Sequence, residues 1–91
     1  MPKGGIEDVD AAVDAARRAM AGEWRKTGAP DRAAMLGKLA RLLESRIEGF
    51  AAAETAQNGK TLFDSDFDLH GTVGCFEYYA GAASKYGGST I

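Results

Sequence analysis

The sequence contains a single cysteine and a single histidine among its 91 residues. One cysteine excludes an internal disulfide bond and a zinc site built from several cysteines. No stretch approaches the roughly 20 apolar residues that a membrane-spanning helix requires, and no apolar segment follows Lys3 to serve as a secretory signal. We therefore expect a cytoplasmic protein without a membrane partner.

A cluster of basic residues is also missing. Eleven basic and thirteen acidic residues are interspersed along the chain and leave a net charge of −2. A general nucleic-acid binder needs a patch of Lys and Arg that neutralises phosphates. Because the basic residues form no patch, we expect no nucleic-acid partner.

The length of 91 residues allows one domain at most. A domain of this size buries a modest fraction of its surface and is marginally stable alone, so the chain is compatible with a part of a larger domain. Residues 1–7 hold two glycines and no periodicity, and we interpret them as a flexible lead-in. Residues 8–91 are then a single helical unit.

Apolar residues recur at helical spacing in three stretches, whereas no stretch alternates as a β-strand does. The longest stretch, the central one, runs from Pro30 to Lys60. Pro30 suits a first helical position, and Gly59 is predicted to be a left-handed cap. Gly49 can divide this stretch into helices near residues 33–48 and 50–58. Its apolar side consists of Leu36, Leu39, Ala40, Leu43, Ile47, Phe50 and Ala51.

A shorter stretch precedes the central one and is expected to pack against it. We predict a helix that begins at Asp8, whose side chain caps it, and ends near Gly22. The connector at residues 23–29 contains Trp24, which we expect to be buried; an exposed Trp24 would instead suggest a surface for a partner. The apolar stripe of this first helix consists of Val9, Ala12, Val13, Ala16 and Met20.

The third stretch follows a short link at residues 61–63. We predict that Asp64 or Ser65 caps it, that Gly87-Gly88 ends it, and that residues 89–91 can begin an extended segment. The side expected to pack on the central stretch consists of Leu69, Val73, Phe76, Ala80 and Ala83. The predicted fold class is all-α, with three to four helices in a hairpin-like pack.

The opposite side of the third stretch is rich in glycine. Phe67, Gly71, Gly74, Tyr78 and Gly81 line up at helical spacing. Each interior glycine costs about 1 kcal/mol relative to alanine. This side therefore indicates either a weak or closely packed helix or a place that a ligand approaches.

Residues able to carry chemistry are few. His70 is expected on the surface in the first turn of its helix, the alternative being proton transfer or binding. Cys75 can act as a nucleophile only if a base or a helix N-terminus activates it, and its mid-helix position favours a small buried hydrophobe. Asp64, Asp66 and Asp68 lack the spacing of a calcium loop. From the residues alone we predict no catalytic, cofactor or metal site in this chain.

Three strings belong together: DVDAAVDAARRAM from Asp8, ETAQNGKT from Glu54 and FEYYAGAASKYGG from Phe76. In this order and spacing they resemble the N-terminal part of the NAD(P)-dependent aldehyde dehydrogenases. The resemblance covers the chain from about Asp8 to Ile91. It implies that these helices pack against an α/β cofactor-binding domain.

The family oxidises aldehydes to carboxylic acids: a cysteine thiolate attacks the aldehyde, hydride passes to NAD or NADP, and a glutamate activates water. The resemblance places that cysteine and glutamate beyond Ile91, so Cys75 does not correspond to the nucleophile. It implies as partners the remainder of the fold, a small aldehyde, and further subunits, since family members are homodimers or homotetramers. We therefore expect an N-terminal fragment without catalytic residues.

One family role carries over by position. The helix matching residues 67–78 borders the tunnel that admits the aldehyde, with Phe67 and Gly71 facing it and Gly74 one turn further. Bulkier residues are often found at the two glycine positions, so the resemblance implies a wide tunnel that favours a bulky or aromatic aldehyde. Gln57 stands where the family commonly has an aspartate that helps hold a structural monovalent cation, which puts that cation site in doubt.

Two other interpretations stay open: a stand-alone helical interaction module, or truncated relative, that keeps the family's shape without its chemistry, and a folding remnant. The interpretations differ in their apolar faces. A fragment exposes the surface that its missing domain would cover, whereas an evolved module is monomeric and polar there.

Overall fold

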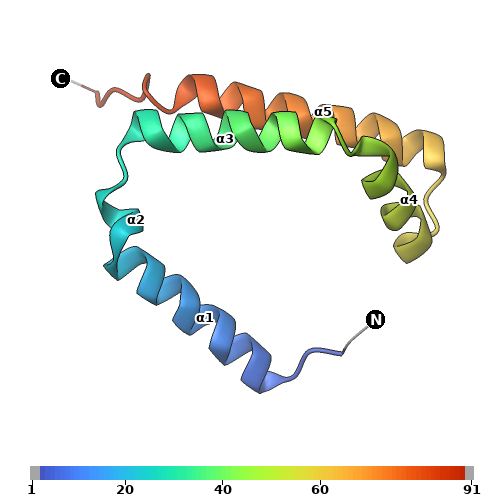
Figure 1. Cartoon of the computed structure of the whole chain (residues 1–91), viewed down its shortest axis with the longest axis horizontal. Coiled ribbons are helices and arrows are strands. Elements are labelled where there is room, and N and C mark those ends of the chain that lie inside the picture. The colour runs from blue at the N-terminus through green and yellow to red at the C-terminus, as the bar shows by residue number, and fades with distance from the viewer. Residues whose placement is uncertain (1–2, 90–91) are drawn as a thin grey trace.

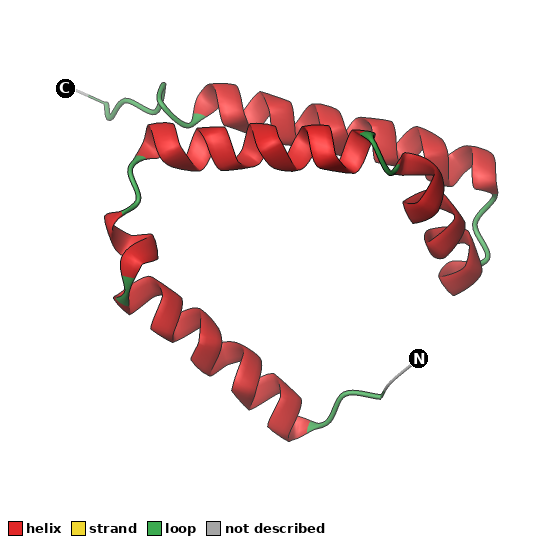
Figure 2. Ribbon diagram, in the orientation of Figure 1, coloured by secondary structure: helices red, strands yellow, loops and turns green. Residues whose placement is uncertain are grey.

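The computed structural model describes residues 3–89 (Figures 1 and 2). Within these residues all regular secondary structure is helical, which confirms the all-α prediction. Of the segment at residues 89–91 that can begin an extended stretch, residues 90 and 91 lie outside the described part, as do residues 1 and 2 of the lead-in. The helices are α1 (Ile6–Ala21), α2 (Glu23–Lys26), α3 (Ala29–Glu44), α4 (Ile47–Asn58) and α5 (Leu62–Ala82).

The helices form a layer and an arm. α3 and α5 lie side by side and antiparallel, and α4 packs on α5 at one end of this pair (Figure 1). α1 packs on α2 and extends away from the layer, so that the chain has an open outline. The radius of gyration is 17.1 Å, whereas a compact chain of this length has about 12 Å.

The buried core lies inside the α3–α5 layer. Ala40, Ile47 and Val73 form its centre, and Ala51 is also buried. The small side chains of Ala40 and Ala51 allow the helix backbones to approach closely. The side of α5 predicted to pack on the central stretch does so through three residues of this cluster, Leu69, Val73 and Phe76.

The central stretch breaks at Ser45 and Arg46, which lie four and three residues before Gly49. The hydroxyl of Ser45 donates a hydrogen bond to the carbonyl of Leu42 at 2.8 Å, and such local bonds compete with the helical ladder. The turn directs Ile47 towards α5, where it is buried. Gly49 lies inside α4 with open space around it, so the break is placed by the burial of Ile47 and not by the glycine.

Gly59 ends α4 as predicted, in the left-handed conformation with φ of 77°. Its N–H donates to the carbonyl of Thr55 at 2.9 Å. At the other end of the chain, α1 begins at Ile6 and not at Asp8. The carboxylate of Asp8 accepts the N–H of Gly5 at 2.7 Å, because an acid in the first turn can reach back to the cap residue.

Like α1, α5 begins earlier in the chain than predicted. The helix begins at Leu62, and the hydroxyl of Thr61 accepts the N–H of Asp64 at 3.1 Å. Asp64 is therefore a first-turn acid and not the cap. α5 ends at Ala82, before Gly87-Gly88.

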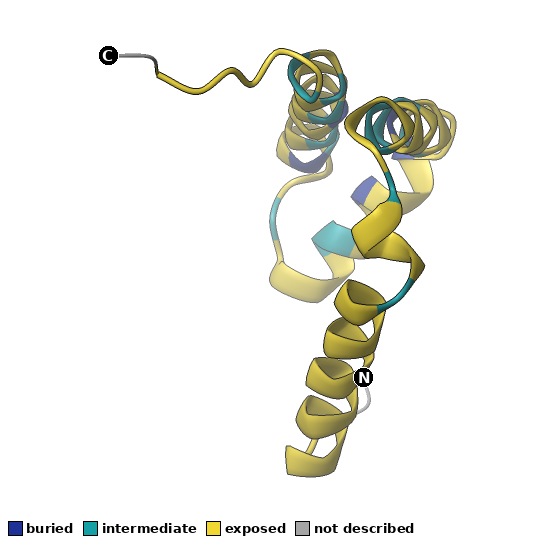
Figure 3. Cartoon of the chain, turned by 90° about the vertical axis from the view of Figure 1, so that its left-hand side faces the viewer, coloured by how far each residue is buried: buried dark blue, intermediate teal, exposed yellow. Residues whose placement is uncertain are grey.

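The prediction that the first helix packs on the central stretch is wrong for this chain alone. No residue of α1 is buried, and Figure 3 shows its whole length exposed. Val9 is 61% exposed and Met20 is 56% exposed. Amphipathic periodicity alone does not supply a neighbour to cover the stripe.

The connector before α3 contains the one-turn helix α2. Trp24 in it is 39% exposed, so the prediction that it is buried is wrong. The guanidinium carbon of Arg32 lies 4.6 Å from the centre of the Trp24 ring, and Arg32 also donates to the Trp24 carbonyl at 2.9 Å. Trp24 thus anchors the connector to α3 by a cation–π contact in place of burial.

Candidate functional site

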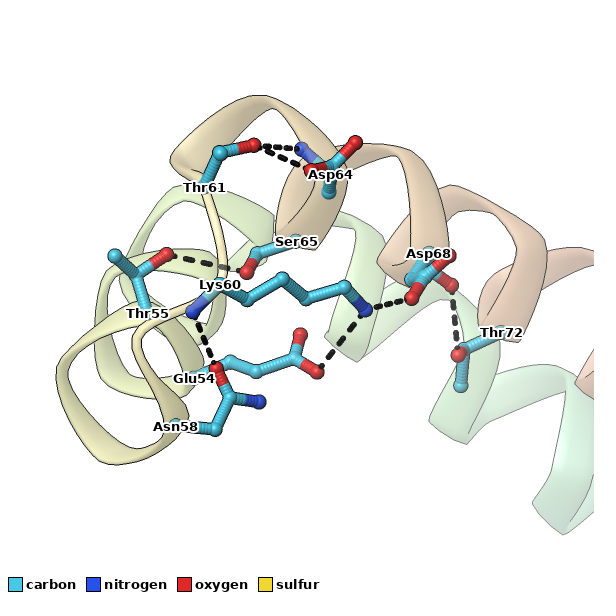
Figure 4. Close-up of polar contacts among 9 residues, drawn as sticks. All are labelled: Glu54, Thr55, Asn58, Lys60, Thr61, Asp64, Ser65, Asp68 and Thr72. Carbon is cyan, nitrogen blue, oxygen red and sulfur yellow. Dashed lines mark hydrogen bonds and ion pairs between the residues drawn. The ribbon is translucent and has the colours of Figure 1, made fainter.

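Polar side chains gather where α4 turns into α5 (Figure 4). The left-handed Gly59 turns the chain, and the ammonium group of Lys60 then forms an ion pair with Asp68 on α5 and lies 3.6 Å from a carboxylate oxygen of Glu54 on α4. The N–H of Lys60 donates to the side-chain oxygen of Asn58 at 2.8 Å. The hydrogen bond to Asp68 is the main cause that raises the pKa of Lys60 above 10.5, while desolvation acts in the opposite direction.

A second polar contact lies under this junction. Ser65 on α5 is fully buried, and its hydroxyl lies 3.1 Å from that of Thr55 on α4. Each hydroxyl can donate or accept, so one bond satisfies this buried polar group. Together with the Lys60 contacts, it fixes the first turns of α5 against the end of α4.

A groove between α4 and α5 runs beside this junction. Gly71 contributes no side chain, and a Cβ built there would meet no atom within 4 Å. The groove therefore has an open position flanked by both apolar and polar groups. Its lining includes Phe50, Gln57, Asp68, Gly71, Thr72 and Cys75.

The three tunnel positions implied by the resemblance lie on α5 with their surfaces open. Phe67 is 71% exposed, and Gly71 and Gly74 have no neighbours within 4 Å of a built Cβ. Close packing of another part of this chain against these glycines is thereby excluded among residues 3–89, whereas a weak helix and the approach of a ligand both stay open. Of the three positions, only Gly71 lines the groove beside α4.

His70 and Cys75 are both exposed. For His70 the surface position is confirmed, although the residue lies beyond the first turn, with Nδ1 2.9 Å from the carbonyl oxygen of Asp66. For Cys75 the prediction of a small buried hydrophobe is wrong, because its side of α5 faces the open groove. The hydrogen bond of His70 is to its own helix, so the structure does not join the two residues into a nucleophile and base.

The carboxylates of Asp64 and Asp68 are paired with neighbouring side chains of this chain. Asp64 accepts from Thr61 at 2.6 Å, Asp68 pairs with Lys60, and within residues 3–89 no three His, Cys, Asp or Glu residues are grouped to hold a metal ion. Gln57 offers a neutral amide. The loss of the family's structural cation site at this position therefore stays a prediction. Likewise, none of the helices in that range is long and apolar enough to cross a membrane.

The sequence NGKT, which joins the end of α4 to α5, contains a signal for this junction. The sequence predicts Gly59 as a cap but gives Lys60 no predicted role. The left-handed Gly59 turns the chain so that the side chain of Lys60 points back over α4. Asp68 lies in the second turn of α5, where the ammonium group of Lys60 reaches it. The spacing of these residues could have indicated the ion pair.

The whole chain, residues 1–91, matches the family model described as the aldehyde dehydrogenase family. The chain is 45% identical over 85 residues to an aldehyde dehydrogenase of Emericella nidulans, covering 93% of this chain and 17% of the relative. It is 46% identical over 92 residues to a mitochondrial aldehyde dehydrogenase of Mesocricetus auratus, covering 98% of this chain and 18% of that protein. A betaine aldehyde dehydrogenase of Bacillus subtilis is 40% identical over 90 residues, with 98% and 18% covered.

The chain thus spans less than a fifth of the length of these relatives, at 17–18%. The matched part is their N-terminal segment. In this chain, the matched segment forms the helical layer and the arm described above. The chain belongs to the aldehyde dehydrogenase family and corresponds to an N-terminal fragment of its members.

Proposed function

We propose that this chain forms the N-terminal helical part of an NAD(P)-dependent aldehyde dehydrogenase and is inert towards aldehydes on its own. In the whole enzyme an aldehyde is oxidised to a carboxylic acid, and bound NAD or NADP accepts the hydride. The chain supplies helices that pack on the cofactor-binding domain and one wall of the route taken by the aldehyde. A cytoplasmic location and assembly into homodimers or homotetramers belong to the same proposal.

The uncovered apolar surface carries this proposal. The accessible surface is 7557 Å², whereas a compact protein of this mass exposes about 5,100 Å². Part of this exposed apolar surface lies on α1, where Val13 is 44% exposed in the middle of a regular stripe. Such a stripe requires a partner surface.

The stand-alone module is the second candidate. It requires polar residues where a larger fold would pack, and α1 carries apolar ones there. The exposed stripe therefore favours the fragment over the module. Amide exchange and the association state of the isolated chain separate the two: we expect weak protection in α1 and self-association, whereas a monomer protected throughout would support the module.

A chimera tests the fragment role directly. This chain would replace the matching segment of the Emericella nidulans relative, and formation of reduced NAD or NADP would be followed with several aldehydes. We expect the chimera to be active, and Val13→Asp to remove most soluble activity because it places a charge in the covered stripe. Asp10→Asn, on exposed α1, is the matched control and should leave activity unchanged. A soluble, folded chimera that oxidises no aldehyde would overturn the proposal, as would turnover by the isolated chain.

The wall formed by Phe67, Gly71 and Gly74 sets the expected substrate class. An exposed aromatic ring beside two positions without side chains favours a bulky or aromatic aldehyde. Gly71→Met in the chimera should lower kcat/KM for large aldehydes by about tenfold or more relative to small ones. Gly49→Met, a same-sized change at an open position of α4, is the control. Equal losses for large and small aldehydes would remove the idea.

A further inference from the structure

Lys60 connects three parts of the polar junction in Figure 4. Its backbone lies in the link after α4, while its ammonium group meets Glu54 of α4 and Asp68 of α5. The left-handed Gly59 and the bond from Asn58 hold the backbone from which this side chain starts. We refer to the contacts among Lys60, Glu54 and Asp68 as the Lys60 clasp.

The clasp is partly shielded from water. The side chains of Lys60 and Glu54 are 30% and 33% exposed, and that of Asp68 is 54% exposed, so the clasp lies between a buried ion pair and a fully exposed one, whose contribution is small. The raised pKa of Lys60 keeps it a cation throughout the neutral range. The clasp is therefore present under the conditions in which an enzyme of this family would work.

The residues that the clasp holds border the groove. Asp68 follows Phe67 directly, and its carbonyl accepts the hydroxyl of Thr72 at 2.9 Å, next to Gly71. The opposite wall is α4, with Phe50 and Gln57. Lys60 thus ties the two walls together at this end, beside the contact between Thr55 and Ser65.

The apolar core reaches the groove through Leu69, and polar contacts hold the helices together nearer the link between α4 and α5. Its centre is formed by Ala40, Ile47 and Val73, and α4 meets the start of α5 through the small residue Ala51 and the buried hydroxyl of Ser65. Without Lys60, the carboxylates of Glu54 and Asp68 would be left facing one another with no cation between them. Like charges at such a position repel, and the groove would widen.

We propose that Lys60 is a positioning residue that sets the width of the groove between α4 and α5 and, through it, the size selectivity for the aldehyde. This inference rests on the proposed function, since the selectivity belongs to the assembled enzyme. Lys60 acts through Asp68 and touches no reacting atom.

The test uses the same chimera and measures kcat/KM for one large and one small aldehyde. Lys60→Met keeps the length of the side chain and removes its charge. The ratio of kcat/KM for the large aldehyde to that for the small one should therefore rise by about threefold or more, a smaller effect than that expected for Gly71→Met. Adding Asp68→Asn to Lys60→Met removes the repulsion between the carboxylates of Glu54 and Asp68, so the ratio should return close to its starting value. Lys60→Arg keeps the cation and should preserve the ratio. Lys38→Met on α3, where no ion pair forms among the described residues, is the control.

Glu54→Gln provides a milder variant if Lys60→Met does not fold. It removes one of the two facing carboxylates while Lys60 and Asp68 stay paired, so the ratio should stay near its starting value. The inference would be overturned if Lys60→Met left the large-to-small ratio unchanged, or if the double variant moved the ratio further from its starting value. In either case the proposed function would still stand, provided that the parent chimera is active. A large change in Glu54→Gln would also contradict it. An inactive parent chimera would instead overturn the proposed function, and this inference with it.

Discussion

α1 and the α3–α5 layer are built from amphipathic helices but lie in opposite environments. α1 carries the more regular apolar stripe, yet none of its residues is buried. α4 and α5 segregate apolar from polar residues less clearly and nevertheless contain the buried Ile47, Ala51 and Val73. Amphipathicity therefore describes what a helix can bury, and its neighbours decide whether burial happens.

This difference gives the two regions different parts in folding. The layer has its own apolar core and polar junction and can hold its shape through contacts inside the chain. The arm is joined to the layer through α2 and the contact between Trp24 and Arg32. The apolar stripe of α1 stabilises the fold only when another surface covers it and removes it from water.

The largest expected effect comes from matched truncations in the two regions. Ile47→Ala in the core should lower the free energy of unfolding by about 2–5 kcal/mol. Val13→Ala on α1 should change it by less than about 0.5 kcal/mol, because the side chain is not buried in the isolated chain. Circular dichroism during urea unfolding, at a concentration where the chain is monomeric, measures both. Similar losses for the two variants would contradict the distinction between layer and arm.

Two glycines of the layer give a smaller effect with opposite signs. Gly59 has φ of 77°, and alanine in the left-handed region costs about 1–2 kcal/mol. Gly49 lies in α4 with nothing within 4 Å of a built Cβ, so alanine there should stabilise the chain by about 0.5–1 kcal/mol. Thermal unfolding of the two variants would be compared with the unchanged chain. Shifts of the same sign would mean that backbone conformation does not control these positions.

The smallest expected effect is the pH dependence of the Lys60 clasp. The pKa of Lys60 is raised above 10.5 in the folded chain, so its contribution is complete below 10.5 and is lost as the pH rises through the folded pKa. From neutral pH upward, the difference in unfolding free energy between the unchanged chain and Lys60→Met should therefore stay constant up to about pH 10.5 and shrink above it. Urea unfolding at a series of pH values measures it. A difference that declines already in the neutral range would show that another group is responsible.

Local chemistry made several positions predictable. Glycine tolerates the left-handed conformation, so Gly59 could be identified as the cap of α4 from sequence alone. The spacing of Leu69, Val73 and Phe76 selected the packed side of α5 correctly. Each of these features depends on residues close together in the chain.

The errors arose where distant segments compete. The break at Ser45 follows from burying Ile47 against α5, which no local signal near Gly49 reveals. Cys75 is exposed because its side of α5 borders the open groove, and Trp24 is exposed because Arg32 meets its ring in place of a packed core. Burial at each of these positions depends on which helix lies opposite.

Residue order alone determined the helical class, the cap at Gly59, the apolar stripes and the family to which the chain belongs. The folded arrangement decided which stripe is covered, where the long central stretch turns, and that Lys60 lies between Glu54 and Asp68. The physical reason is that periodicity is a property of one helix, whereas burial and ion pairing require a second element at a defined distance.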